Sequence, residues 1–420
     1  MKQIVQLSGA KFPSLVVALF ISIAAGQTGA QTLTPAEEAE QKKIVEPEAA
    51  KSRVAIYGWV ESGVTGNVDG PDDKQNFGRI FDDRSNEFVM NQAVITAERV
   101  LDPKVGFDWG FKLQLMFGTD ARFIHSLGLL DHTMGSSVYQ PDIPEAYLSL
   151  HLPILTEGGV DIKLGKFVTL EGAETIDPRT NVFYSHTYIF NFGIPFNHTG
   201  ALFTLHANKW LDLMAGVTRG VNTSIDDNNG APAFHGGLGL NFNDGKVVVS
   251  ASTHIGPETP HDNHDLRYLS DITTTWKITD KLTSITDLNY ALDEAVGAKA
   301  YGIAQYLTCS INSWLTAGIR GEIFRDDRGF YVVSFADNED PMRALRGEPT
   351  IDPRTVGGGR TTYGALTAGV NIKPPMPKPI SGLTIRPELR YDRALTNMRP
   401  FNDSRDRDQF TAAVDFILAF

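Results

Sequence analysis

Apolar and polar residues alternate one by one through much of this sequence. The clearest segment spans 107–118, where Phe107, Trp109, Phe111, Leu113, Leu115 and Phe117 alternate with Asp108, Gly110, Lys112, Gln114, Met116 and Gly118. A period of two places these two sets on opposite faces of a β-strand, one bulky and apolar and the other mostly polar or small. The same split recurs at 211–218, 315–323 and 408–420. This repetition predicts an all-β protein.

The alternation predicts about sixteen strands, although fourteen to eighteen would also fit the pattern. The expected strands are 54–66, 87–100, 106–118, 144–152, 159–167, 198–207, 210–220, 233–243, 246–256, 266–278, 281–292, 298–309, 312–324, 361–373, 381–392 and 408–420.

The connections between these strands alternate between short and long. Short ones include Asn243-Asp244-Gly245, which is a strong hairpin signal, and the turns at 208–209 and 310–311. Long ones fall between them, at 67–86, 119–143, 168–197, 221–232, 257–265 and 325–360. A soluble β-sandwich has no reason to sort its connections in this way. Short periplasmic turns, long extracellular loops and an even strand count are typical of a closed antiparallel transmembrane β-barrel, which we expect over 51–420.

The first thirty residues have the features of a secretory signal peptide. Lys2 and Lys11 are basic, an apolar stretch follows from Ser14, and small residues precede Gln31. We expect cleavage near residue 30, a short polar periplasmic tail over 31–50, and a location in the outer membrane of a Gram-negative cell. No later stretch has the ~20 apolar residues that a transmembrane helix needs.

Composition removes several classes of function. The chain has 38 basic and 50 acidic residues, a net charge of −12, which argues against a nucleic-acid surface. Its single cysteine, Cys309, excludes an intramolecular disulfide framework. The ten histidines show no zinc-protease spacing, and neither a nucleophile elbow nor a phosphate-binding glycine loop is present. Acidic clusters such as Asp72 with Asp73 lack the spacing of a calcium loop. The sequence therefore predicts no enzyme activity, no cofactor and no metal site.

Three segments carry family resemblances. The C-terminus, DQFTAAVDFILAF, resembles the terminal strand by which barrels are recognised for assembly, with Phe420 as the signal residue. The stretch from Leu164, with Gly165-Lys166-Phe167, Asn181 before Phe183-Tyr184-Ser185, Pro195-Phe196 and His198, resembles the putative beta-barrel porin-2 family. Tyr57-Gly58-Trp59, with Glu61-Ser62-Gly63, is similar to the opening strand of that family. The resemblance implies an outer-membrane barrel and brings no catalytic residues with it.

The polar face of each strand should line the lumen. The candidate pore-lining residues are Asp108, Lys112, Gln114, Lys163, Arg267, Asp271, Lys277, Arg320, Glu322, Arg386, Glu388 and Arg390. Mixed charges facing water would orient solutes and set ion selectivity, although cross-strand ion pairs that only stiffen the wall explain them equally well.

The loop at 168–197 is the candidate constriction. Loops of about thirty residues are usually functional or disordered, and this one is too aromatic for disorder. We expect it to fold into the lumen, where Glu171, Glu174, Asp177, Arg179, Asn181 and Tyr184 would narrow the passage. A packed external cap is the alternative.

The leading hypothesis is a porin that allows passive diffusion of small hydrophilic solutes or ions, because a sixteen-stranded barrel leaves room for a water-filled channel. The alternatives are a plugged structural or adhesion barrel and a secreted soluble β-rich glycan-binding protein. The expected partners are outer-membrane lipid and lipopolysaccharide, the barrel-assembly machinery and small solutes, and further copies of the chain would make a homo-oligomer.

Overall fold

The computed structural model describes residues 54–420 except 136, 336–337 and 349–358. The expected signal peptide and the tail at 31–50 lie outside these residues. The described chain forms sixteen antiparallel strands: β1 (Ala55–Asn67), β2 (Phe88–Arg99), β3 (Asp108–Gly118), β4 (Gln140–Leu152), β5 (Val160–Val168), β6 (Asn197–Asn208), β7 (Leu211–Thr218), β8 (Ala233–Phe242), β9 (Val247–Pro257), β10 (Leu266–Lys277), β11 (Leu282–Asp293), β12 (Ala298–Asn312), β13 (Leu315–Asp326), β14 (Thr361–Ile372), β15 (Gly382–Ala394) and β16 (Asp408–Ala419).

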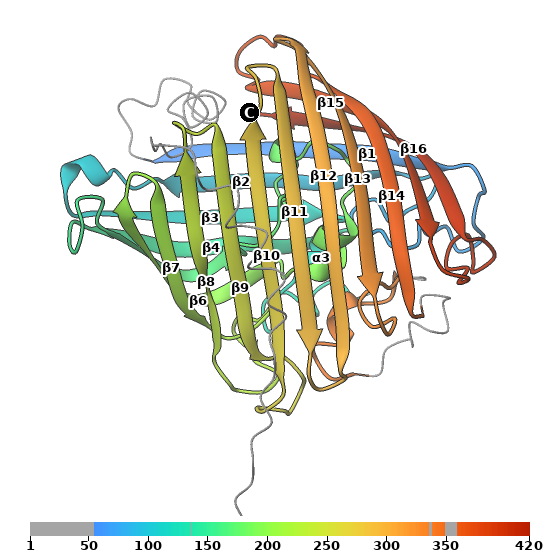
Figure 1. Cartoon of the computed structure of the whole chain (residues 1–420), viewed down its shortest axis with the longest axis horizontal. Helices are drawn as coiled ribbons and strands as arrows, with labels where there is room; N and C mark the ends of the chain where they lie inside the picture. The colour runs from blue at the N-terminus through green and yellow to red at the C-terminus, as the bar shows by residue number, and fades with distance from the viewer. Residues whose placement is uncertain (1–53, 136, 336–337, 349–358) are drawn as a thin grey trace, which may run out of the picture.

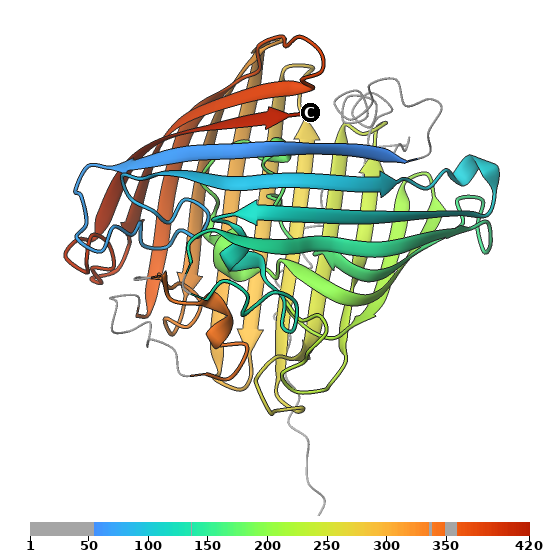
Figure 2. The ribbon, with the colours of Figure 1, turned by 180° about the vertical axis from the view of Figure 1, so that it is seen from behind.

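Each strand pairs with its neighbours in sequence, and β16 pairs with β1 to close the barrel. Figures 1 and 2 show the strands of the two opposite walls crossing at a steep angle, as the tilt of barrel strands requires. The predicted count of sixteen is confirmed, and so is the alternation of short turns with long loops, apart from the short connection at 294–297 between β11 and β12. Closure leaves no open sheet edge, which a bilayer would not tolerate. No helix in the described residues is long and apolar enough to cross a membrane.

The last residue completes the closure. The backbone N–H of Phe420 donates to the carbonyl of Gly58, and the N–H of Gly58 donates to the carbonyl of Phe420, both at 3.0 Å. A Cβ on Gly58 would lie 2.2 Å from the carbonyl oxygen of Val94 and 2.7 Å from the ring of Phe420. Glycine is therefore needed at position 58 for the ends of the barrel to meet.

Two predicted strand boundaries are wrong. β4 begins at Gln140, four residues before its expected start, because a bulge between Gln114 and Met116 lets the pairing of β3 with β4 continue. The turn expected at 310–311 lies three residues later, at 313–314, because a bulge between Ser310 and Asn312 carries β12 to Asn312.

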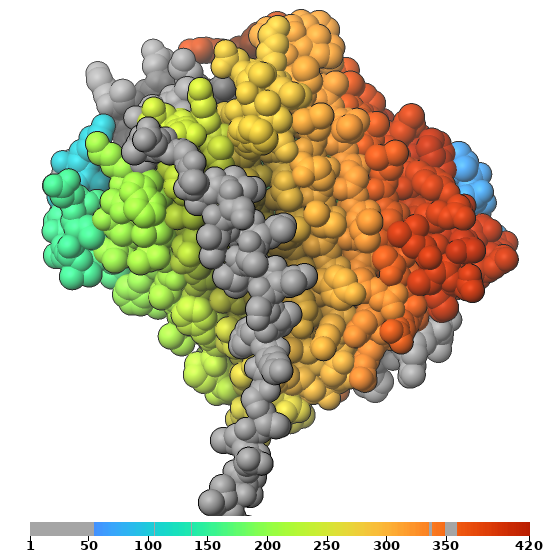
Figure 3. Space-filling model, viewed as in Figure 1, coloured from blue at the N-terminus to red at the C-terminus, as the bar shows by residue number. Residues whose placement is uncertain are grey.

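The two faces of the wall differ as the alternation predicts. Side chains such as Leu113, Leu115 and Phe117 are 42–46% exposed on the outer face, whereas Gln114 and Met116 between them are buried on the inner face. Figure 3 shows this outer wall from the side of β11–β15, with side chains filling the spaces between neighbouring strands. An apolar outer belt suits lipid, and a polar interior suits water or buried polar contacts.

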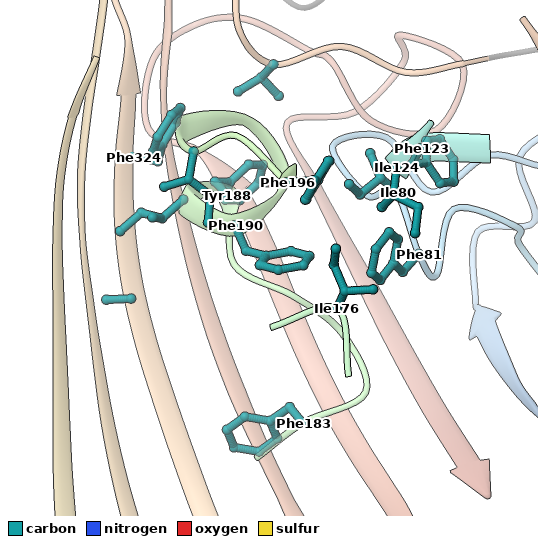
Figure 4. Packing of buried hydrophobic residues seen from close by; sticks show 14 of the residues in the cluster. Ile80, Phe81, Phe123, Ile124, Ile176, Phe183, Tyr188, Phe190, Phe196 and Phe324 are labelled. Atoms are coloured by element: carbon teal, nitrogen blue, oxygen red, sulfur yellow. The ribbon is translucent and has the colours of Figure 1, made fainter. Parts of the chain in front are cut away.

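The hydrophobic core lies inside the barrel. Figure 4 shows the side chains of Phe81, Phe123, Tyr188, Phe190 and Phe196 gathered between the walls, where they come from three different loops. All four residues of the short helix α3 (Ala121–Ile124) are buried there. The long loops on the extracellular side therefore fold inward and pack on one another.

Candidate functional site

The loop between β5 and β6 lies inside the barrel and contacts the wall along much of its circumference. From β5 it passes β8, β10 and β11, where backbone groups of 170–173 are hydrogen-bonded to wall side chains. A 3-10 turn (Pro178–Thr180) then lies beside β15, and a π-helical turn (Ile189–Gly193) packs against β11 and β12. Polar wall residues on many strands thus hold one loop in place.

Arg320 on β13 makes the densest single connection to this loop. Its Nη1 lies 2.7 Å from Glu174 Oε1 and 2.7 Å from the carbonyl oxygen of Ser185, and its Nη2 lies 3.1 Å from Ser185 Oγ and from Thr367 Oγ1. Burial alone would raise the pKa of Glu174, but the guanidinium of Arg320 holds it below its usual range. Glu174 also accepts from Thr187 N–H at 2.8 Å. One buried ion pair thus joins two limbs of the loop to the wall.

Two further arginines on β15 hold the loop through its backbone carbonyls. Arg386 donates from Nη1 to the carbonyls of Pro178 and Asn181, at 2.8 and 3.0 Å, while its other nitrogens contact Asp415 and Glu61. Arg390 donates to the carbonyl of His186 at 2.5 Å. Its Nη2 lies 2.8 Å from Asp392 and 3.0 Å from Glu322.

The three arginines, Arg320, Arg386 and Arg390, are fully buried, and each is matched by carboxylates of the wall or of the loop. Because each guanidinium already has carboxylate partners, the three arginines form buried ion pairs. Little net positive charge is therefore left in the lumen to attract anions.

Wall carboxylates also accept hydrogen bonds from backbone N–H groups in the aromatic part of the loop, residues 183–192, here called the aromatic limb. Glu388 accepts from Tyr184 N–H at 2.9 Å, and Glu322 accepts from Tyr188 N–H at 2.8 Å. The hydroxyl groups of the two tyrosines reach Asn91 and Asp392, at 2.9 and 3.2 Å. The limb is therefore fixed at both its backbone and its side chains. Burial lowers the pKa of His186, in the same limb, to about 4, so that its ring is neutral at physiological pH.

The remaining constriction candidates occupy the turn near β1. Asp177 accepts from Arg179 Nη2 at 2.7 Å, and the Arg179 guanidinium lies 4.1 Å above the ring of Trp59. Asn181 Oδ1 accepts from Thr175 N–H at 2.9 Å, which closes the turn. All six predicted loop residues thus lie within the barrel, although the ion pair of Asp177 is with Arg179 of the same loop and not with a wall residue.

The twelve pore-lining candidates all lie on the inner face of the wall, opposite the exposed apolar side chains. Beyond the arginines and Glu388, the contacts are Asp108 with Arg99, Lys112 with Glu145, Gln114 with Thr96, Lys163 with the ring of Tyr147, Arg267 with Asp293, Asp271 with the N–H of Gly172, and Glu322 with Arg390. Lys277 lies on the inner face near the periplasmic end of β10. Most of these residues are engaged in contacts within the protein, as the ion-pair interpretation predicts.

Exposure differs between the two halves of the lumen. Near the extracellular ends of the strands, inner-face residues such as Asn67, Asp326 and Asp392 are buried. Near the periplasmic ends, the side chains of His206 and Asp212 are 29% and 32% exposed. The inserted loops therefore fill the extracellular half, whereas some inner-face side chains near the periplasmic ends remain partly exposed.

Sequence reasoning missed a second inserted loop, between β1 and β2. Arg79 of that loop is fully buried, 2.5 Å from both Asp82 and Asp392, and Phe77, Ile80 and Phe81 enter the core. The sequence signal was weak, because only a few apolar residues interrupt a loop that otherwise looks solvated.

The contact between three buried histidines was also not predicted from the sequence. The rings of His198, His235 and His254, on β6, β8 and β9, lie in contact with centroids 4.2 to 5.8 Å apart, and those of His198 and His254 are stacked. Their positions in the sequence share no metal-binding motif. In the described part of the chain, no group of three or more His, Cys, Asp or Glu residues is placed to hold a metal ion.

A known protein family matches the whole of the barrel. The model of the Putative beta-barrel porin-2, OmpL-like family matches residues 53–420. The chain belongs to this family. No curated protein matches it.

Several solved outer-membrane structures resemble this member of the porin-2 family in fold. The outer membrane channel DcaP of Acinetobacter baumannii is 12% identical with a TM-score of 0.52, over 87% of this chain and 97% of that one. OprB of Pseudomonas putida is 11% identical with a TM-score of 0.53, over 94% and 100% of the two chains. An anion-selective porin from Comamonas acidovorans is 9% identical with a TM-score of 0.53, over 87% and 99%. At these identities the likeness shows the fold alone, a closed antiparallel β-barrel.

Proposed function

We propose that this family member is a passive outer-membrane porin for small hydrophilic solutes or ions, with the loop at 168–197 as its constriction. The observation that carries the proposal is the loop itself, which lies across the lumen and is held by buried wall charges at Arg320, Arg386 and Arg390. A loop fixed in this way sets the width of a passage without closing the barrel at its ends. No covalent chemistry is part of the proposal, and the chain acts as a channel, not an enzyme.

Charge in the lumen favours cations over anions. The three buried arginines, Arg320, Arg386 and Arg390, are paired with five carboxylates, those of Glu174, Glu61, Asp415, Glu322 and Asp392. Since the charge that lines the narrowest region governs selectivity, the excess of carboxylates would attract cations. The expected partners are the surrounding lipid and lipopolysaccharide, the assembly machinery acting on Phe420, and the solute. Self-association is compatible with the fold.

The test is reconstitution of the purified, folded barrel in planar bilayers. The porin proposal expects stepwise current, with a reversal potential in a KCl gradient that indicates preference for K⁺. Swelling of liposomes in sugar solutions would then give the size limit for neutral solutes. A folded barrel that carries no current at any protein concentration would contradict the proposal.

A plugged structural barrel is the second candidate, because the extracellular half of the lumen is densely packed. The core joins Phe81, Phe123 and Phe190 from three loops, and few inner side chains in that half are exposed. Silence in bilayers from a barrel with heat-modifiable gel mobility would favour this candidate. A soluble secreted protein would show no such mobility shift.

A further inference from the structure

The first part of the inserted loop, residues 170–173, here called the first limb, is attached to two carboxylates of the wall. Asp271 Oδ1 on β10 accepts from Gly172 N–H at 3.0 Å, and Asp287 Oδ2 on β11 accepts from Ala173 N–H at 3.1 Å. The side chain of the preceding residue, Glu171, is only 3% exposed and lies where the charge of Asp287 acts on it. Three carboxyl groups, here called the carboxyl cluster (Glu171, Asp271 and Asp287), thus meet at this attachment.

The carboxyl cluster has no basic partner among the described residues. Both Oε atoms of Glu171, Oδ2 of Asp271 and Oδ1 of Asp287 are buried and accept no hydrogen bond. Leaving several ionised carboxylates buried together costs far more free energy than the two backbone hydrogen bonds return. Something must neutralise the cluster while the loop is docked.

The groups that face the cluster do not supply a positive charge. Glu174, next along the loop, is itself acidic, and the Arg320 guanidinium is engaged by it at 2.7 Å. His235 on β8 accepts from Leu170 N–H through Nε2 at 3.3 Å, so that nitrogen carries no proton. Asn289 on β11 donates to the carbonyl of Gly193 and is uncharged. The oxygens of the cluster are not arranged as a metal-ligand set in the described residues.

Protons are the remaining neutralising species. Asp271 and Asp287 approach closely enough to share a hydrogen bond when one of them is protonated. Burial, together with the charge of Asp287, raises the pKa of Glu171 to about 8, whereas a released loop would return it to its ordinary range. The docked limb therefore binds a proton that the released limb gives up. By linkage, docking weakens as the pH rises from the ordinary pKa of Glu to about 8.

We propose that the carboxyl cluster is a proton-dependent attachment that holds the first limb of the loop on β10 and β11 at low pH and releases it at high pH. Its effect on conduction rests on the proposed porin function, but the attachment itself does not. Release would free residues 170–173, while Arg320 on β13 and Arg386 and Arg390 on β15 keep the rest of the loop, from Glu174 onward, in place. The lumen would then widen on the side of β8–β11.

The test is hydrogen exchange of peptides covering 169–176 in the folded full chain, at pH 5.5 and pH 9. Wild type is compared with Glu171→Gln and Asp287→Asn at the same pH, so that intrinsic exchange rates cancel. The amide introduced by Asp287→Asn can still accept from Ala173 N–H, and the amide introduced by Glu171→Gln is neutral at both pH values. Both variants therefore keep the attachment without its charge. Glu157→Gln, in the exposed turn between β4 and β5, is the matched control.

At pH 9 the wild type and the control should exchange at least ~10-fold faster in this segment than Glu171→Gln, and at pH 5.5 all four proteins should agree. Equal protection of wild type and Glu171→Gln at pH 9 would overturn the proposal. If the exchange rate of Asp287→Asn at pH 9 also equalled that of the wild type, a folding defect in the Glu171→Gln variant alone could not explain the missing difference. Recovery of wild-type protection at pH 9 on addition of Ca²⁺, reversed by chelation, would replace the proton by a cation and also overturn it.

Conductance of the same proteins separates this inference from the porin proposal. Wild-type current should rise between pH 5.5 and pH 9, and that of Glu171→Gln should change less. Silence of all the proteins together with the expected exchange difference would contradict only the porin proposal. Current without an exchange difference would contradict only the carboxyl cluster.

Discussion

Removing the guanidinium of Arg320 tests the attachment of the loop most severely. In Arg320→Met the side chain keeps a similar length but loses its contacts with Glu174, Ser185 and Thr367, which lie at 2.7 to 3.1 Å. It also leaves Glu174 buried without its counter-charge. The Glu174 pKa, held low by Arg320, should rise, and the group should take up a proton.

The magnitude follows from the burial of the pair. Breaking a buried ion pair by removing one partner costs about 3–5 kcal/mol. At about 1.4 kcal/mol per tenfold change, the ratio of docked to released loop should fall by roughly two to three and a half orders of magnitude. Arg320→Met/Glu174→Gln removes both charges, so its loop should be better protected than that of the single variant.

The assay is limited proteolysis of 172–192 in the folded barrel, together with open-channel noise in bilayers. Arg325→Met is the matched control, because Arg325 lies on the same strand, on the outer face, paired in register with the exposed Tyr301. Cleavage and noise should increase in Arg320→Met only. Equal cleavage rates for wild type, control and Arg320→Met would refute the reasoning that this ion pair holds the loop.

Three further predictions concern closure, pH and orientation of the wall. Gly58→Val should reduce the heat-modifiable folded band, because its side chain would collide with the carbonyl of Val94 and the ring of Phe420. Gly382→Ala, where a Cβ has open space, should fold normally. Equal folded fractions of the two variants would contradict this account of closure. Burial raises the pKa of Asp120 to about 7, so the folded state binds a proton more tightly and loses stability as the pH rises from about 4 to 7. Asp120→Asn should therefore show a smaller loss of urea midpoint between pH 4 and pH 8 than wild type, and parallel curves would count against it. Cys309 is exposed on β12, a strand whose alternate residues face outward. A fluorophore attached to it should therefore be quenched by brominated lipid chains. If a water-soluble quencher reached the fluorophore instead, the two faces of the strand would be assigned the wrong way round.

The strand pattern was predictable because lipid and interior impose different chemistry on alternate residues. The run from Phe107 to Gly118 carries that difference in its own composition, and so do the terminal residues up to Phe420. Strand ends at Gln140 and Asn312 were not predictable, since bulges there extend pairing without leaving a local signal.

The interior was only partly predictable, because its contacts join residues far apart in sequence. The loop at 168–197 could be singled out by its length and aromatic content, and the structure places it inside the barrel. Its partners could not be named, since Arg386 meets Pro178 and Arg390 meets His186 across more than 200 residues. Buried carboxylates without cations, as at Glu171, are visible only once the fold brings the wall strands and the loop together.

Single-channel conductance of the barrel with and without its inserted loop tests the central claim most directly. Residues 172–192 would be replaced by a short Gly-Ser linker between Glu171 and Gly193, and folding would be checked by heat-modifiable mobility. The account predicts stepwise current in wild type and a larger step in the shortened variant. Equal steps would contradict the constriction, and a folded barrel that is silent in both forms would contradict the porin.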